Sequence, residues 1–166
     1  VAAARSADLL YDLASEAKPG MKGSLATVVA DVTEASGRSA MLQCALNNFG
    51  GVDVLVNNAG VMIDSMLQQQ KVNDMTIMFN TNIMSTILMC QASLRFFLKK
   101  RKGNIINVSS IIGENGAIGQ SVYSATKAAV LGFTKSLSKE LARLNINVNS
   151  ISPGYIDTNM TQKYNQ

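Results

Sequence analysis

The sequence contains no histidine, no tryptophan and only two cysteines, and these shortages exclude several kinds of site. Without histidine, the chain can build neither a Ser-His-Asp triad nor a histidine-ligated metal centre. Cys44 and Cys90 lack the close spacing of metal-binding cysteines, so we expect no metal site. We interpret both as reduced, buried thiols of an intracellular protein.

Long uncharged stretches are also missing, since no run of about 18 apolar residues occurs. We therefore expect no membrane span. Hydrophobic residues make up 47% of the 166 positions but aromatic residues only 5%, which predicts one globular domain with an aliphatic core. We expect a cytoplasmic protein, with the mitochondrial matrix as the alternative because a targeting segment would lie outside this chain.

Basic residues are scattered except in the run Lys99 to Lys102. One interpretation is a set of cations at a helix C-terminus, stopped by Gly103, and the other is a nucleic-acid patch. No aromatic residues alternate with the basic ones as stacking platforms, so we favour the helix terminus and expect no nucleic-acid partner.

Stretches of strand and helix character alternate along the chain. We expect strands at 1–4, 24–30, 52–57, 105–109 and 146–151, and helices at 6–17, 33–49, 72–101 and 121–144, with a break near the start of the third helix and a glycine-rich loop at 113–119. This order predicts an α/β fold of the three-layer α/β/α kind, with a parallel sheet and helices on both of its faces.

Polar or turn-forming residues follow four of the predicted strands: Asp31, Asn58 to Gly60, Ser109 with Ser110, and Pro153 with Gly154. Because parallel strands end at one edge of their sheet, these residues should share that edge, where ligands bind in such folds.

Tyr123 and Lys127 lie four residues apart on a predicted helix, so their side chains should share a face. A tyrosine has a pKa near ~10, and a neighbouring ammonium lowers it, which allows proton exchange with an alcohol or carbonyl oxygen. Ser110 could hydrogen-bond the same oxygen. The alternative is a tyrosine and a lysine at this spacing by chance.

The helix Met75 to Leu98 has apolar residues around most of its circumference, which predicts a second covered face and hence assembly with further copies. Asn82 lies in its middle and must be hydrogen-bonded if buried. It either satisfies neighbouring backbone or opens the helix locally and holds a water near Lys127.

These motifs together make the chain resemble the short-chain dehydrogenase/reductase family over essentially its whole length. The matching residues are Asp31-Val32, Asn57 to Gly60, Asn82, Ser110, Tyr123-x-x-x-Lys127, and Pro153-Gly154 with Thr158. The resemblance implies a single NAD(P)-binding Rossmann-like domain over residues 1–166.

The resemblance also implies a role for each matching residue. Asp31 and Val32 would line the adenine pocket, and Asn58, Ala59 and Gly60 would pass under the cofactor. Tyr123 would exchange the proton, and Ser110 would orient the substrate, being preferred over Ser109 because it lies thirteen residues before Tyr123. Lys127 would lower the tyrosine pKa and bind ribose, and Asn82 would carry a relay water. The nicotinamide end of the cofactor would be bound by Pro153 and Gly154, and its carboxamide would be positioned by the backbone of Ile156 and the hydroxyl of Thr158.

Stretches such as Gly119 to Tyr123 and Pro153 to Thr161 are similar to the 3-oxoacyl-acyl-carrier-protein reductases and carbonyl reductases of this family. Arg5 sits where members that prefer the phosphorylated cofactor carry a basic residue, which favours NADP(H), with NAD(H) as the alternative. The other interpretation of Arg5 is a solvated charge after a strand.

The family's glycine-rich diphosphate turn is missing, because no glycine precedes Gly20, so we expect the 166-residue chain to bind a dinucleotide poorly. We expect a piece of a longer enzyme, incomplete at both ends, whose C-terminal closure is also absent. The expected activity is NADP(H)-dependent reduction of a small-molecule or carrier-bound 3-oxoacyl carbonyl by a homotetramer assembled through helices 75–98 and 121–144. The alternatives are an alcohol or hydroxysteroid dehydrogenase and an inactive scaffold.

Overall fold

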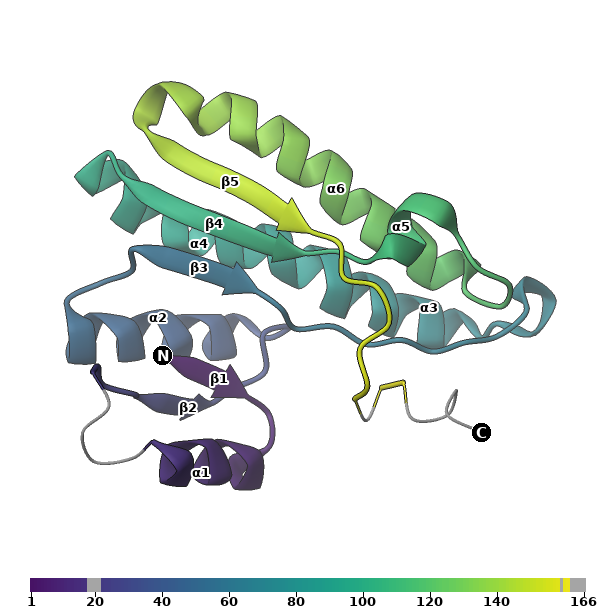
Figure 1. Cartoon of the computed structure of the whole chain (residues 1–166), viewed down its shortest axis with the longest axis horizontal. Coiled ribbons are helices and arrows are strands. Elements are labelled where there is room, and N and C mark those ends of the chain that lie inside the picture. The colour runs from purple at the N-terminus through teal and green to yellow at the C-terminus, as the bar shows by residue number, and fades with distance from the viewer. Residues whose placement is uncertain (18–21, 159, 162–166) are drawn as a thin grey trace.

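The computed structural model describes residues 1–17, 22–158 and 160–161, in which strands and helices alternate (Figure 1). The elements are β1 (Ala2–Ala4), α1 (Ala7–Glu16), β2 (Thr27–Val29), α2 (Ala35–Phe49), β3 (Val54–Asn57), η1 (Leu67–Gln69), α3 (Val72–Phe79), η2 (Asn80–Met84), α4 (Ser85–Lys100), β4 (Gly103–Val108), α5 (Ile111–Asn115), α6 (Ser121–Leu141), η3 (Ala142–Leu144) and β5 (Ile146–Ile151). Every strand pair is parallel, so the predicted Rossmann-like α/β fold is confirmed.

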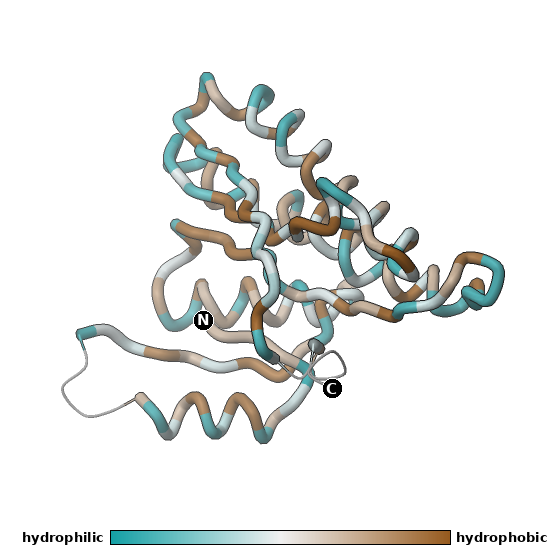
Figure 2. Tube along the Cα trace, turned by 45° about the vertical axis from the view of Figure 1, so that its right-hand side comes forward, coloured by the Kyte–Doolittle hydropathy of each residue, from teal (hydrophilic) through white to brown (hydrophobic). Residues whose placement is uncertain are grey.

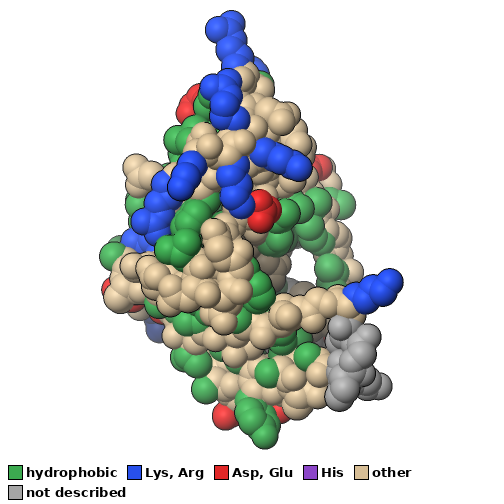
Figure 3. Space-filling model, turned by 90° about the vertical axis from the view of Figure 1, so that its left-hand side faces the viewer, with side chains coloured by type: hydrophobic (Ala, Val, Ile, Leu, Met, Phe, Trp, Pro, Cys, Tyr) green, Lys and Arg blue, Asp and Glu red, His purple; other side chains and the backbone are tan. Residues whose placement is uncertain are grey.

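The strands form two sheets rather than the single sheet that the sequence predicts. β1 pairs with β2, and β3, β4 and β5 pair in that order. All strands run in the same sense, and the edges of β1 and β3 that pair with no described strand border one cavity (Figure 1). Figure 3, viewed from the side on which the strands begin, shows a hollow between the two halves with hydrophobic side chains on its walls.

The three-stranded sheet has one buried face and one open face. Leu55, Ile105 and Val148 are buried on the face that packs against α4 and α6. The alternate residues point the other way, and Val54 and Val56 there remain 52% and 54% exposed. The core comprises Leu42, Leu55, Met89, Cys90, Phe97, Ile105, Leu137, Leu141, Ile146 and Val148. Figure 2 shows hydrophobic stretches along the strands and hydrophilic ones at many loops.

The helix ends differ in detail from the sequence-based expectations. α4 ends at Lys100 because Arg101 adopts the left-handed conformation, with φ 47°, so Gly103 is not the stop signal we expected. Gly103 instead begins β4, where a Cβ atom would overlap the ring of Phe97. Lys99 and Lys100 lie in the last turn of α4, as the helix-terminus interpretation predicts.

The expected loop 113–119 is partly helical. The side chain of Ser110 accepts a hydrogen bond from the Ile112 amide and caps α5, which ends before Gly116 at φ 73°. The predicted strand 24–30 is shorter, spanning Thr27–Val29. The predicted stop of the first helix at Pro19 and Gly20 lies outside the described residues.

Both cysteines are free thiols, but only Cys90 is fully buried. Desolvation raises the pKa of Cys90 to about 12, so its thiol stays protonated. Cys44 is half-buried, which corrects the expectation of two buried thiols.

Candidate active site

A cavity of about 1320 Å³ opens at the carboxyl ends of the strands. Its lining contains every residue that the sequence singles out except Asn82: Arg5, Asp31, Val32, Asn58, Ala59, Gly60, Ser110, Tyr123, Lys127, Pro153, Gly154, Ile156 and Thr158. The expectation that the four post-strand groups share one edge is therefore confirmed. Parallel pairing causes this convergence, because it places all the strand ends on one side.

Tyr123, Ser110 and Lys127 meet in this cavity. Tyr123 and Lys127 lie on the buried face of α6, with side chains 8% and 4% exposed, and the Lys127 ammonium is 5.8 Å from the centre of the Tyr123 ring. Ser110, which follows β4, hydrogen-bonds the Tyr123 side chain. A phenol, a hydroxyl and an ammonium thus line the same cavity, and these are groups that can transfer a proton to a carbonyl oxygen.

Two consecutive residues at the end of β4 fix Lys127 at both ends. Its ammonium donates a hydrogen bond to the carbonyl of Val108 at 2.9 Å, and its own backbone carbonyl accepts one from the Ser109 hydroxyl at 2.8 Å. Ser109 therefore positions Lys127 while Ser110 faces Tyr123, which agrees with the preference for Ser110 from sequence. Gly113 allows this close approach, since a Cβ there would lie 2.8 Å from the Lys127 backbone carbon.

The pKa of Tyr123 is raised, whereas the sequence-based expectation was that Lys127 lowers it. Burial raises the pKa of Tyr123 above its usual value, the hydrogen bond from Ser110 opposes that rise, and the Asp64 carboxylate adds to it. The expected lowering by Lys127 is not found. Desolvation lowers the pKa of Lys127 itself to about 8, because its ammonium faces a neutral carbonyl rather than a carboxylate. Tyr123 is thus a neutral phenol at pH 7, ready to donate a proton.

Asn82 lies in the π-helical turn η2, which is the predicted break in the long helix. Its side chain is 1% exposed and binds both backbone groups of Val61, with the amide of Val61 donating at 2.8 Å and its carbonyl accepting at 2.9 Å. It also donates to the Thr126 hydroxyl at 2.9 Å. The backbone-satisfying interpretation is confirmed, and the helix does open locally at this residue. A relay water remains a prediction.

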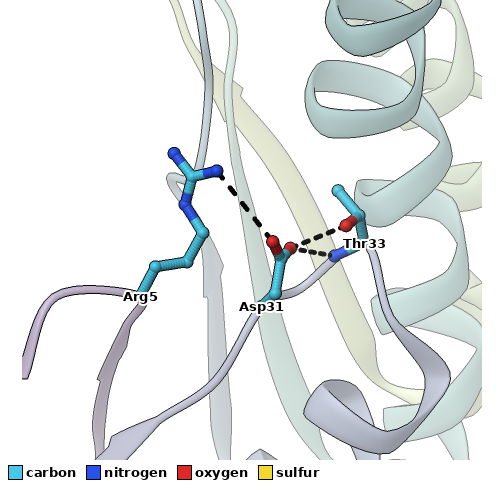
Figure 4. Close-up of polar contacts among 3 residues, drawn as sticks. All are labelled: Arg5, Asp31 and Thr33. Atoms are coloured by element: carbon cyan, nitrogen blue, oxygen red, sulfur yellow. Dashed lines mark hydrogen bonds and ion pairs between the residues drawn. The ribbon is translucent and has the colours of Figure 1, made fainter.

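Arg5 and Asp31 also line the cavity. Figure 4 shows the contacts of Asp31 with Arg5 and Thr33. Asp31 accepts hydrogen bonds from the Thr33 hydroxyl and amide at 2.7 and 2.8 Å, which lower the pKa of its carboxyl; burial opposes them, and the Arg5 charge 3.9 Å away also lowers it. Because Arg5 is 73% exposed and its ion pair is long, its guanidinium stays available to an anionic ligand.

The segment after β5 closes one side of the cavity. Pro153 accepts a hydrogen bond from the Ile111 amide at 3.1 Å, which ties this segment to the start of α5. Ile156 and Thr158 lie farther along the same wall and are exposed. Their predicted roles beside the cofactor stay a prediction.

Sequence reasoning missed a polar contact next to Tyr123. Gln120 is 8% exposed and donates hydrogen bonds to the Asp64 carboxylate at 3.2 Å and to the Met62 sulfur at 3.3 Å. The Ser65 amide also donates to the Gly119 carbonyl at 2.9 Å. Only the position of Gln120, three residues before Tyr123, signals this contact, since Asp64 is 59 residues away in sequence from the tyrosine (123 − 64 = 59).

Residues 1–17, 22–158 and 160–161 contain no group of three or more acidic, cysteine or histidine side chains that could hold a metal ion. None of their helices is long and apolar enough to cross a membrane.

Comparison with known proteins identifies close relatives. The sequence model of the short chain dehydrogenase family matches residues 1–166. The 3-oxoacyl-(acyl-carrier-protein) reductase FabG of Vibrio cholerae is 43% identical over 135 residues, which cover 81% of this chain and 55% of the relative. Carbonyl reductase family member 4 of Xenopus tropicalis is 44% identical over 115 residues, covering 69% and 49%. The chain thus spans about half the length of the curated relatives it matches.

A solved structure described as ElxO with NADP bound shares the fold. It superposes with a TM-score of 0.78 at 36% identity, over 83% of this chain and 56% of that one. The likeness therefore extends from motifs to the arrangement of strands and helices.

Proposed function

The chain belongs to the short chain dehydrogenase family, and on that premise we propose that it carries the catalytic centre of an NADP(H)-dependent reductase of 3-oxoacyl thioesters or related carbonyl compounds. The observation that carries this proposal is the meeting of Tyr123, Ser110 and Lys127 in one cavity. The 3-oxoacyl reductases and the carbonyl reductase among its relatives support the substrate class.

In this proposal Tyr123 donates the proton to the carbonyl oxygen. Its raised pKa keeps the phenol neutral at pH 7, which suits reduction, the direction that consumes a proton. Ser110 donates a second hydrogen bond to the same oxygen and stabilises the developing alkoxide. Lys127 holds a positive charge near both groups, and the Asn82 to Thr126 contact steadies the helix that carries it.

The cavity residues fit the adenosine and nicotinamide ends of a nicotinamide dinucleotide, whereas the glycine-rich turn for its diphosphate is missing. At the position of Gly60, an added Cβ would lie 3.4 Å from both the Asn82 amide oxygen and the Lys127 ammonium, so the absence of a side chain there keeps the floor of the cavity open. Asp31, Val32 and Arg5 would hold the adenosine end, with Arg5 facing a 2′-phosphate. When bound, the nicotinamide would supply the hydride.

We also propose assembly into a homotetramer through helices 75–98 and 121–144. Ile77 and Met84 are 39% and 45% exposed, although they lie on helices adjoining the core. α6 exposes Ala128 and Gly132, and an added Cβ at Gly132 would meet no atom within 4 Å, so this face is flat enough for close helix packing.

Two alternatives to this function are compatible with the same site residues. An alcohol or hydroxysteroid dehydrogenase would rely on the same three side chains in the oxidative direction. An inactive scaffold would keep the fold and the assembly surface alone.

We propose that the protein is located in the cytoplasm, which the free thiols of Cys44 and Cys90 support.

The deciding experiment combines cofactor binding with turnover on the 166-residue chain. Because the glycine-rich turn is missing, we expect weak NADPH binding, seen as a fluorescence increase larger than that for NADH, and slow reduction of acetoacetyl pantetheine thioester at the expense of NADPH. Oxidation of secondary alcohols without thioester reduction would favour the dehydrogenase alternative. The absence of both NADPH binding and turnover would favour the inactive scaffold.

A further inference from the structure

A second, smaller pocket lies between α2 and α4 and is here named the arginine pocket. Its volume is about 320 Å³, at the lower end of the range of roughly 300–1,000 Å³ that small-molecule sites occupy. Its described lining comes from two helices: Ala35, Arg38, Ser39 and Leu42 of α2, and Leu88, Gln91, Ala92 and Arg95 of α4. Two guanidinium groups thus share a small pocket with apolar side chains.

Two backbone carbonyls hold Arg38 in place beside this pocket. The Nη1 atom of Arg38 donates hydrogen bonds to the carbonyl oxygens of Val32 and Thr33, both at 2.8 Å. Its Nε and Nη2 N–H groups remain for a ligand, because no described residue accepts a hydrogen bond from them. In a planar guanidinium these two groups form a fork that matches the two oxygens of a carboxylate. A guanidinium that is already fixed loses less freedom when it binds such an anion.

Neither arginine of the pocket has an acidic partner among the described residues. The ion pairs found there involve neither Arg38 nor Arg95. Glu34 lies one turn before Arg38 but forms no ion pair with it. Arg95 lies over the ring of Phe96, 4.8 Å from the ring centre. The pocket therefore carries positive charge without a counter-charge from this part of the chain, and a bound anion would supply it.

The apolar part of the lining distinguishes between kinds of anion. Leu42 is buried and Leu88 is half-buried, and both line the pocket together with two alanines. A ligand with an alkyl chain would cover these side chains and remove apolar surface from water. Inorganic phosphate would satisfy the arginines but leave that surface uncovered. The lining thus favours an anion with a short apolar chain.

We propose that the arginine pocket binds a short aliphatic carboxylate, with its oxygens at Arg38 and Arg95 and its alkyl chain against Leu42 and Leu88. The proposal is separate from the proposed function, since it requires neither a dinucleotide nor turnover. Arg38 also bonds the carbonyl of Val32, a residue that lines the larger cavity. The carboxylate would therefore bind next to the segment predicted to line the adenine pocket.

Titration of the 166-residue chain with sodium butanoate tests this proposal, followed by NMR of the arginine Nε–H signals. The signals of Arg38 and Arg95 should shift together and reach saturation. Arg38→Gln and Arg95→Gln should each weaken butanoate binding by about tenfold or more, because each removes a charge-assisted hydrogen bond. The Arg95 side chain makes no hydrogen bond to a described residue, so Arg95→Gln tests the site even if loss of the Arg38 contacts disturbs the fold.

Two matched ligands and one matched variant serve as controls. Butanamide keeps the alkyl chain and removes the charge, so it should not bind. Acetate should bind about threefold or more weakly than butanoate, because it lacks the methylene groups that would contact Leu42 and Leu88. Arg143→Gln removes an exposed arginine that does not line the pocket, and it should bind butanoate like the wild type.

Several outcomes would overturn the proposal. They are the absence of a saturable shift at Arg38 and Arg95, equal binding of butanamide or acetate, and equal weakening by Arg143→Gln. Shifts confined to Arg5 would place the carboxylate in the larger cavity and would also overturn it. Shifts of the pocket signals with protein concentration, without butanoate, would identify a second copy as the occupant instead.

Discussion

The ammonium of Lys127 donates its hydrogen bond to the backbone carbonyl of Val108, 2.9 Å away, and not to a carboxylate. This contact ties the face of α6 that carries Tyr123 and Lys127 to the end of β4. It also leaves the charge of Lys127 without an anionic partner in a desolvated position, which is why the pKa of its ammonium falls to about 8. Several measurable properties depend on this arrangement.

Tyr123→Phe should abolish most reductase turnover while leaving NADPH affinity largely intact. Loss of a general acid lowers the rate by about 100-fold or more, and the phenyl ring preserves the packing of the buried side chain. Steady-state kinetics and NADPH fluorescence measure the two quantities. Tyr11→Phe is the matched control, because Tyr11 is 76% exposed on α1 and should show wild-type turnover. Wild-type turnover in the Tyr123 variant would contradict the mechanism.

The phenol of Tyr123 should titrate above its usual pKa, because burial is the main influence on it. The difference in ultraviolet absorbance between the wild type and Tyr123→Phe isolates this titration. Ser110→Ala should raise the pKa of Tyr123 further and Asp64→Asn should lower it, since they remove opposing influences. Shifts in the reverse directions would refute this electrostatic account.

Lys127 should make the free energy of unfolding depend on pH. The pKa of its ammonium is about 8 in the folded chain and near 10.5 when unfolded, so the unfolded state binds more protons in this range. The charged form therefore costs stability below pH 8, and the cost shrinks as the pH rises toward 10.5. Relative to Lys127→Met, the wild type should gain about 1.5 kcal/mol between about pH 8 and about pH 9.5 in urea unfolding. Parallel pH dependence in the two proteins would argue against a buried ammonium.

Asn82→Ala should destabilise the fold by about 2 to 4 kcal/mol, because it leaves both backbone groups of Val61 and the Thr126 hydroxyl without their partner. Urea unfolding measures the loss. Asn80→Ala, in the same π-helical turn but exposed, is the control and should change stability by less than about 0.5 kcal/mol. A similar cost for both variants would assign the effect to the turn and not to the Asn82 side chain.

Gly132→Glu should dissociate the proposed tetramer, since it places a charge on the flat face of α6 without meeting any neighbouring atom in the monomer. Sedimentation velocity at micromolar concentration should show a smaller species for Gly132→Glu and an unchanged one for Gly132→Ala. A wild-type chain that sediments as a monomer would refute assembly at this concentration.

The sequence by itself determined the alternation of strands and helices and the site at the strand ends. Those features depend on local periodicity and on the parallel order of the strands, so Tyr123 and Lys127 could be placed on one helix face from their spacing alone. Ser110 could be preferred over Ser109 because it lies thirteen residues before Tyr123 (123 − 110 = 13), the spacing that the family resemblance implies.

Only the tertiary structure decided which groups are desolvated and which strand edges stay unpaired. The raised pKa of Tyr123 depends on burial and on Asp64, which is remote in sequence, and the partner of Lys127 is a backbone carbonyl that no residue type reveals. The division into two sheets cannot be read from local sequence either, because β1 pairs with β2 and β3 pairs with β4, and such pairing depends on how the strands are placed in space. These pKa values and strand pairings depend on contacts between residues that are far apart in the sequence, so the spacing of residues along the chain does not predict them.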